Sequence, residues 1–370
     1  MGTPMRTLRT PALVVLLVSA GLLGGSAGAR RVQQGSSPFA AQIASLSEPA
    51  GYFDTDNLIS NERSYLQVLP DLRRRNVRGG GYIGVGPDQN FTYIADVRPA
   101  VAFIIDVRRD NLLLHLLFKA LFSLSRTRVE YLALLFGRTV PADVEPWRTA
   151  AVDRIAAAVE GAPPGPAVVD AARKRVDEAI ARIGVPLSAD DRATIDRFHR
   201  TFIAEGLALR FQSTGRAPQS YYPTYRDMLV DVDDSGRHGN YLASEEAFQF
   251  VKGLEARDLV IPVVGDVSGP SALAAIGRAL DARHERLSAF YVSNVEFYLF
   301  RDGSFPRFVA NLGRVPHLPN SVLIRSIFGR YGSGGYRPGD ASVSRLAAVD
   351  DLLREYAAGH IRQYDDIVMR

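Results

Sequence analysis

The sequence predicts an α/β protein in which a doubly wound, mostly parallel sheet carries a helical insertion. Three observations lead to this prediction. Short apolar runs alternate with helical patterns after residue 80 and again after residue 258, which is typical of successive βαβ units. Residues 126–212 between them are largely helical in period. The chain of 370 residues is 46% hydrophobic, so it is large and apolar enough to form a substantial core.

The N-terminal residues 1–29 are typical of a secretory signal peptide. Basic residues precede the apolar run Ala12–Leu23, and small residues around Ala29 form a cleavage site before Arg30. The run is shorter than the ~20 residues that span a bilayer. We therefore expect an exported protein, periplasmic or secreted, with no stable membrane span after cleavage. The alternative is an uncleaved N-terminal anchor. Residues 30–50 are expected to form a linker, since they are rich in Ser, Gly, Ala and Gln.

The main domain is expected over residues 51–370, and it starts with a polar segment and a helix. Ser60 is placed to cap a helix that begins at Asn61 and has apolar residues on one face. The polar residues of this segment do not have the spacing of a calcium loop, so a helix-capping loop or a lid over a pocket is expected. These residues are Asp54, Asp56, Asn57 and Glu62.

Residues 80–111 contain the pattern strand, glycine turn, short helix, strand. Gly84 and Gly86 form the turn, and they have no Cβ, so a ligand can lie close to the backbone there. Asp106 ends the second strand, where its carboxylate can accept hydrogen bonds from two ribose hydroxyls. Asp106 is equally well placed to cap the following helix. This order is that of the first half of a Rossmann-like nucleotide-binding sheet.

Asp88 argues against a dinucleotide ligand. It lies in the glycine turn, where a carboxylate repels a pyrophosphate, and the third glycine of the dinucleotide fingerprint is missing. A ligand without phosphates, such as S-adenosylmethionine, fits this turn better.

The insertion is expected to cover roughly residues 112–243. A very apolar helix over Leu112–Phe122 should pack on the sheet, and its His115 is interpreted as a core histidine. Further helices follow, of which the last, Ala189–Gly206, has Ser188 as its N-cap with acidic residues in its first turn. The Tyr-, Pro- and Gly-rich segment Gln212–Asn240 is expected to be an extended loop.

Alternation of helices and strands then resumes. Strands are predicted at Leu259–Val264, Leu287–Tyr291 and Val322–Ile327. Helices are predicted to begin at Ser244 and Ser271 and to cover Val343–Tyr356. With the two earlier strands, this gives five parallel strands.

Polar residues follow two of the later strands. Asp266 follows the third strand, either as a ligand contact or as a turn residue, and Asn294 and Glu296 follow the fourth. Because the carboxyl ends of parallel strands share one edge, these residues are expected near Gly84, Gly86 and Asp106.

Several other classes of protein are disfavoured. The histidines have no paired metal spacing, so no metal site is predicted. A net charge of +4 is no strong signal for nucleic acid, and none is expected as a partner. The chain has no cysteine, which excludes thiolate chemistry and disulfides. The sequence leaves the oligomeric state open.

The order of motifs resembles that of S-adenosylmethionine-dependent methyltransferases. The segments GYFDTDNLISNE, YIGVGPDQNFTYIA and IDVRRDN are also similar to those of an uncharacterised bacterial family described as methyltransferase-like. The resemblance covers most of residues 48–330.

This resemblance implies S-adenosylmethionine as the cofactor and gives roles to individual residues. Gly84, Gly86 and Asp88 would lie along the donor, Asp106 would hold its ribose, and Asp266 would meet its adenine. Asn294 and Glu296 would be the catalytic residues that orient the acceptor. Two departures from the methyltransferase pattern are Tyr82, at the position of a usual acid, and the export signal on a protein with a cytosolic donor.

Two functions therefore follow from the sequence. The first is a methyltransferase that acts on an unidentified small molecule. The second is an exported, non-catalytic binding or structural protein that retains the methyltransferase-like fold.

Overall fold

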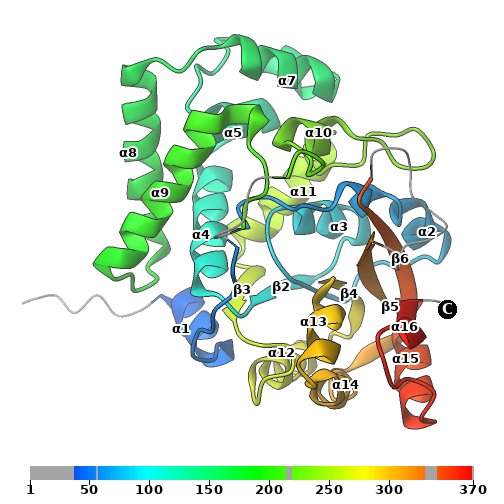
Figure 1. The fold of residues 1–370 in the computed structure, drawn as a ribbon. Helices are drawn as coiled ribbons and strands as arrows, with labels where there is room; N and C mark the ends of the chain where they lie inside the picture. Colours follow the sequence, from blue (N-terminus) through cyan, green and yellow to red (C-terminus); the bar gives the residue numbers. More distant parts are fainter. Residues whose placement is uncertain (1–36, 56, 214–218, 330–339, 369–370) are drawn as a thin grey trace, which may run out of the picture. The chain divides into compact units, whose positions relative to one another are not determined.

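The apolar runs of the sequence form a six-stranded sheet in the computed structural model, which describes residues 37–55, 57–213, 219–329 and 340–368 (Figure 1). The first four strands are buried over most of their length, as expected for strands covered on both faces. The strands are β1 (Gly81–Gly84), β2 (Val101–Asp106), β3 (Val260–Val264), β4 (Leu287–Ser293), β5 (His317–Phe328) and β6 (Ser342–Ala348).

The strand order is β3-β2-β1-β4-β5-β6. The pairs from β3 to β5 are parallel, and β6 is antiparallel to β5, with Ile324 opposite Leu346. The predicted α/β class and its mostly parallel sheet are therefore confirmed. The strand order reverses between β1 and β4. From the carboxyl ends of these two neighbouring strands the chain therefore crosses over in opposite directions.

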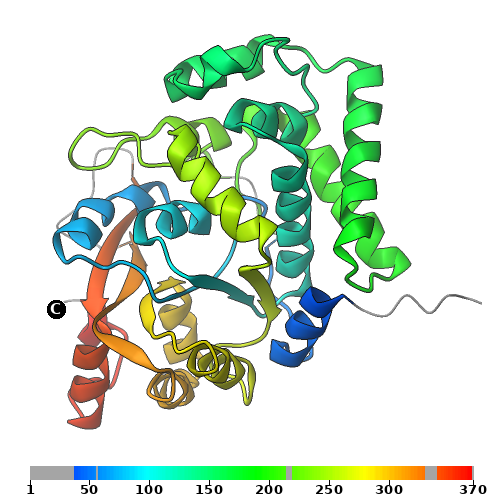
Figure 2. The same ribbon diagram turned by 180° about the vertical axis from the view of Figure 1, so that it is seen from behind.

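Helices cover both faces of the sheet (Figures 1 and 2). On one face lie α3 (Gln89–Val97), α4 (Arg109–Leu124) and α11 (Glu245–Ala256), with α2 (Leu69–Arg74) beside α3. On the other face lie α12 (Ala272–Asp281), α13 (Val295–Arg301) and α14 (Phe305–Leu312). At the far edge α15 (Val349–Ala357) packs on β5 and β6, and the short α16 (Asp365–Val368) follows.

The long segment between β2 and β3 contains helices and no strand among its described residues. Its helix α4 is buried on every side from Asn111 to Phe122, because it packs on β2 and β3 and also against α5, α8 and α9. The inserted helices pack either directly on α4 or on one another. They are α5 (Arg128–Leu135), α6 (Glu145–Arg148), α7 (Val152–Gly161), α8 (Pro166–Ile183), α9 (Ala189–Glu205) and α10 (Tyr225–Val230), with the 3₁₀ turn η2 (Gly206–Ala208).

The predicted helix caps of this segment are present. Ser188 caps α9, and its side chain and that of Asp191 form a reciprocal capping box. Ser244 caps α11 by accepting a hydrogen bond from the Ala247 N–H.

The predicted linker over residues 30–50 is wrong for its second half. Residues Pro38–Leu46 form helix α1, which packs on β3 and α12. The composition led to a wrong prediction, because a segment rich in small residues can still form a helix with a buried apolar face. In α1 this face includes Phe39 and Ile43. Glu48, which follows α1, accepts hydrogen bonds from the Ser271 N–H (2.6 Å) and the Ala272 N–H (2.5 Å), so it caps α12.

Three other predictions need correction. The predicted helix Val343–Tyr356 is the strand β6 followed by α15, because residues 342–348 pair with β5 and that tertiary contact outweighs local helix propensity. The predicted loop Gln212–Asn240 contains α10, which Thr224 caps. The helix expected from Asn61 is the shorter 3₁₀ helix η1 (Arg63–Leu66), followed by α2.

The predicted signal peptide lies outside the described residues. Of the helices that the structure does describe, none has the length and apolar character needed to cross a membrane.

Candidate functional site

A cavity of about 340 Å³ lies at the carboxyl ends of β1, β2, β3 and β4. We call it the sheet-edge cavity. Residues that follow each of these strands form one part of its wall, and the segment from Tyr52 to Glu62 forms another. The cavity spans the point between β1 and β4 where the strand order reverses, which is where doubly wound sheets bind ligands.

Four of the predicted site residues meet in the wall of the sheet-edge cavity, although they come from four different strands. They are Gly86, Asp106, Asp266 and Asn294. Gly84, Asp88 and Glu296 are not among the described residues that line it.

Gly84 has a packing role. A Cβ on this residue would lie 1.8 Å from Asn90 Oδ1 and 2.8 Å from the Tyr82 hydroxyl. These two groups are hydrogen-bonded to each other, with Tyr82 as the donor at 2.8 Å. Asn90 in turn donates to the carbonyl oxygens of Val85 and Pro87, so it holds the turn after β1. The missing Cβ of Gly84 therefore makes room for Asn90, not for a ligand.

Asp88 and Glu296 are buried away from the cavity. Asp88 accepts hydrogen bonds from the Tyr225 hydroxyl (3.1 Å) and the Tyr241 hydroxyl (3.3 Å), which fastens α3 to the inserted helices. Burial raises the pKa of the Asp88 carboxyl to about 6, against the effect of these bonds. Glu296 forms a bidentate ion pair with Arg325 of β5, at 2.6 and 3.0 Å.

Gly86 adopts a left-handed backbone, with φ at +82°, a conformation in which glycine meets no steric penalty. Its carbonyl oxygen accepts a hydrogen bond from His115 Nε2 at 2.9 Å, so Nε2 carries the proton. Burial lowers the pKa of His115 to about 4, so the ring is neutral at pH 7. His115 is thus a core histidine, as predicted, and it also fixes the turn at Gly86.

Asp106 is held by its neighbour Arg108. Asp106 Oδ1 accepts hydrogen bonds from the Arg108 N–H (2.9 Å) and Nε (3.1 Å), and Oδ2 accepts one from Nη2 (2.8 Å). A carboxylate oxygen accepts about two hydrogen bonds, so Oδ1 is saturated by Arg108 while Oδ2 retains capacity for one more. Asp106 can therefore hold one ligand hydroxyl, not the pair that was expected.

Asp266 forms a turn, as one of its two expected roles requires, and it also lies in the cavity wall. Its Oδ1 accepts hydrogen bonds from the Ser268 N–H (2.7 Å) and hydroxyl (2.9 Å), which forms a turn. The residue is nevertheless exposed and lies in the cavity wall beside Asp106, because β2 and β3 end side by side. One oxygen of the Asp266 carboxylate therefore forms the turn, and the residue itself lines the cavity.

Glu62 is the main functional candidate that the sequence reasoning did not select. It lines the sheet-edge cavity, yet its side chain is buried, and its carboxylate accepts four hydrogen bonds. Oε1 accepts one from Ser293, and Oε2 accepts from the hydroxyls of Tyr291 (2.6 Å) and Ser326 and from Gln89 Nε2 (3.3 Å). One signal was available in the sequence: Tyr291 and Ser293 are two residues apart on a strand, so their polar groups share a face.

The Glu62 carboxyl is a strong proton acceptor by its surroundings. Burial raises its pKa above the ordinary value, and the four hydrogen bonds oppose that rise only in part. The raised pKa is the property that a general base needs near neutral pH.

The hydroxyl groups around Glu62 continue into the protein as a chain. Ser326 meets Ser344 of β6 at 3.4 Å between their oxygens, and Ser344 meets Ser64 at 3.1 Å. Ser64 then meets Ser342 at 2.7 Å. These contacts give the buried carboxylate a polar environment across β4, β5 and β6.

Gln89 presents an unused acceptor beside Glu62. Its Nε2 is the group that donates to Glu62, and its Oε1 is buried with no hydrogen-bond partner among the described residues. The residue is 2% exposed and lines the sheet-edge cavity. A buried carbonyl without a donor costs roughly 1–3 kcal/mol, so a ligand N–H or O–H at this place would be favoured.

Several residues that line the sheet-edge cavity have an unusual backbone conformation. Asn57 (φ 50°) and Ser293 (φ 52°) have left-handed backbones and line the cavity together with Gly86. Such conformations cost a serine about 1 kcal/mol or more and gather at binding sites, where the surrounding structure enforces them.

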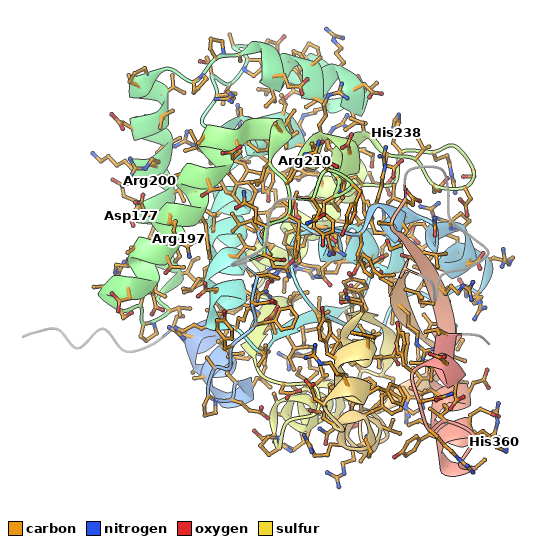
Figure 3. The ribbon with its side chains drawn as sticks, in the orientation of Figure 1. Asp177, Arg197, Arg200, Arg210, His238 and His360 are labelled. Carbon is orange, nitrogen blue, oxygen red and sulfur yellow. The ribbon has the colours of Figure 1, made fainter. Side chains whose placement is uncertain are left out.

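Another cavity, of about 570 Å³, lies elsewhere, between α8 and α9. Its walls are charged, and Arg173 and Asp196 pair across it at 2.6 Å. Figure 3 shows Asp177 on α8 and Arg197 and Arg200 on α9, on the inserted helices and away from the sheet. This groove has no catalytic grouping comparable to that around Glu62. Among the described residues, no cluster of three metal-ligating side chains occurs.

The chain matches the protein family described as "Domain of unknown function (DUF7790)" over residues 57–144 and 189–344. These two segments cover about two thirds of the chain, so the protein belongs to this family. They include Glu62 and all four predicted residues of the cavity wall. Residues 145–188, which contain α6 to α8, lie between the matched segments. A comparison with curated proteins finds no match.

Proposed function

We propose that this member of the DUF7790 family is an S-adenosylmethionine-dependent methyltransferase with a Rossmann-like, methyltransferase-like sheet. The observation that carries the proposal is the convergence of Gly86, Asp106, Asp266 and Asn294 on one cavity where the strand order reverses. The acceptor is a small molecule.

The charges of the sheet-edge cavity favour a cationic ligand over a phosphorylated one. Two arginines line it, but Arg108 pairs with Asp106 at 2.8 Å and Arg301 pairs with Asp302 at 2.9 Å. Glu62 and Asp266 then add negative charge to the wall. A pyrophosphate would meet repulsion here, whereas an ammonium or sulfonium group would be attracted.

The polar groups of the wall fit the parts of the donor. The Gln89 Oε1 supplies an acceptor for an ammonium group, close to the turn at Gly86. Asp106 Oδ2 accepts one ribose hydroxyl, and Asp266 lies one strand further, where an adenine would extend. When bound, the donor supplies a methyl group on a positively charged sulfur.

Calorimetry with S-adenosylhomocysteine and S-adenosylmethionine tests the proposal. We expect binding of both, and a loss of affinity in Gly86→Val, because a β-branched side chain at φ +82° is strained and reaches toward Asn57. Asp106→Asn should weaken binding by about tenfold or less, since it affects one charge-assisted hydrogen bond. An absence of heat with either ligand at millimolar concentration would reject the methyltransferase.

One observation favours the alternative of an exported, non-catalytic binding protein. The bidentate hold of Arg108 on Asp106 occupies most of the carboxylate that would bind a ribose. Under this alternative, native protein retains a different ligand, which mass spectrometry of the purified chain would identify. Export itself is tested by N-terminal sequencing of protein from its native host: a start at Arg30 supports it, and an intact Met1 in the cytosol contradicts it.

A further inference from the structure

We infer that a second cavity next to the first is the acceptor site, and that it takes an uncharged planar aromatic molecule with a nucleophilic hydroxyl. This inference rests on the proposed methyltransferase for its reaction, but its binding part stands on separate observations. The second cavity has a volume of about 360 Å³, which is within the range of small-molecule sites. We call it the aromatic cavity.

The two cavities share a wall. Phe53, Asn57, Asn61, Ser293, Asn294 and Tyr298 line both of them. A molecule in the aromatic cavity would therefore lie next to a molecule in the sheet-edge cavity. Transfer needs the reacting atoms about 3–3.5 Å apart, so the two ligands would meet where the cavities adjoin.

Aromatic rings form much of the second cavity. Tyr298 packs edge-to-face with Phe53 at 5.1 Å and with Phe297 at 5.4 Å between ring centroids, and Phe297 also meets Tyr364 at 5.4 Å. Phe211 and Tyr222, which also line this cavity, meet at 5.1 Å between ring centroids. A flat aromatic ligand would extend this edge-to-face packing, which stabilises a ring pair beyond the burial of its area.

Exposed aromatic side chains border the same region. The exposed large hydrophobic residues of the described chain are Tyr52, Tyr221 and Phe297. Tyr52 lines the sheet-edge cavity, Phe297 lines the aromatic cavity, and Tyr221 meets Tyr222 of that cavity at 4.7 Å. Since exposed aromatic surface is otherwise unfavourable, its position beside the two cavities indicates a binding function.

The described lining of the aromatic cavity disfavours an anionic occupant. Among the described residues it has one carboxylate, Asp54, and no lysine, arginine or histidine. This part of the wall offers no counter-charge to a carboxylated or phosphorylated aromatic, which favours an uncharged acceptor.

Glu62 and Ser293 supply the proton acceptor at the shared wall. The Ser293 hydroxyl donates to Glu62 Oε1 and so can accept a hydrogen bond from the acceptor hydroxyl in turn. As the acceptor oxygen forms a bond to the methyl carbon, the carbon–sulfur bond breaks and its electron pair stays on sulfur. The hydroxyl proton passes through Ser293 to the Glu62 carboxylate, so an aryl methyl ether, a neutral thioether and a protonated Glu62 result.

Calorimetry of the full chain with 2-naphthol tests the aromatic cavity without any turnover. We expect 2-naphthol to bind the wild type, and Phe297→Ala to weaken that binding about fivefold to tenfold, since the ring contact is lost. Phe250→Ala is the matched control, because Phe250 is a half-buried ring that lines neither cavity and packs against Arg98. The anionic 2-naphthoate should bind at least about tenfold more weakly than 2-naphthol.

The outcomes separate this inference from the proposed function. Equal affinity of Phe297→Ala and wild type for 2-naphthol, or equal binding of 2-naphthoate, would overturn the aromatic site whether or not S-adenosylhomocysteine binds. Binding of 2-naphthol that depends on Phe297, together with no binding of S-adenosylhomocysteine, would keep the aromatic site and reject the methyltransferase. With both bound, formation of 2-methoxynaphthalene is expected from the wild type.

Discussion

The Tyr291 hydroxyl donates a hydrogen bond of 2.6 Å to Glu62 Oε2 and so connects strand β4 to the turn before η1. Tyr291 is buried, and its oxygen also accepts a hydrogen bond from Gln89 Nε2 at the start of α3. Three elements from distant parts of the chain therefore meet at one carboxylate. A substitution of Glu62 therefore alters the wall of the sheet-edge cavity itself and does not act through the glycine turn after β1.

Glu62→Gln should abolish most methyl transfer while it leaves S-adenosylhomocysteine binding within a few-fold of wild type. A lost general base costs roughly 10²–10⁴-fold in rate. In the wild type the rate should rise with pH through the raised pKa of Glu62, because the carboxylate is the active form. Glu255→Gln is a matched control, since Glu255 is also a buried carboxyl with a raised pKa, but it pairs with Lys119 on α4. Equal rates for Glu62→Gln and wild type would contradict this role.

Gly84→Ala should destabilise the protein more than Gly86→Ala does. At Gly84 the added methyl group meets Asn90 at 1.8 Å, so the buried hydrogen bonds of Asn90 must break, at a cost of several kcal/mol. At Gly86 the cost is the left-handed backbone, about 1 kcal/mol. Gly253→Ala on α11 is the control, and it should be neutral or slightly stabilising because its surroundings are open. Denaturant midpoints of the three variants give the order.

Asp88→Asn should stabilise the protein at neutral pH relative to acidic pH. The folded-state pKa of about 6 lies above the ordinary value of 3.8, so the wild-type carboxyl contributes stability below pH 3.8 and loses it as the pH rises through 6. The difference in unfolding free energy between variant and wild type should therefore grow between about pH 4 and 6 and level off above, by roughly 2–3 kcal/mol in total. Chemical denaturation at pH 4.5, 6 and 8 measures it. A difference that stays flat with pH would show that the carboxyl is not buried as described.

Glu296→Gln should lower stability and leave ligand affinity unchanged. Its partner Arg325 would remain buried without a counter-charge, which costs about 3 kcal/mol. The exposed pair of Asp351 and Arg354 provides the control, since Asp351→Asn should change stability by less than about 0.5 kcal/mol. If fully folded Glu296→Gln bound S-adenosylhomocysteine more weakly than wild type, Glu296 would have to be counted as a residue of the binding site.

The parts of the site that could be predicted are those that follow buried strands. Asp106, Asp266 and Asn294 could be predicted because the end of an apolar run locates a strand terminus, and parallel strands bring their termini to one edge. Asp88 shows the limit of this reasoning. Its position after the glycine turn was evident, but the direction of its side chain depends on Tyr225 and Tyr241, which come from the insertion.

The sequence by itself determined the α/β class, the strands β1 to β5, several helices such as α4 and the Ser188-capped α9, and the segments that end at the sheet edge. These depend on local periodicity and on capping groups a few residues apart, so they are encoded within short windows. Only the tertiary structure decided which polar side chains are buried and which groups they contact. Glu62 is a buried hydrogen-bond acceptor because Tyr291, Ser293 and Ser326 donate to it. Residues 342–348 form strand β6 because they pair with β5. Burial and pairing depend on residues far apart in the chain, and no local pattern contains them.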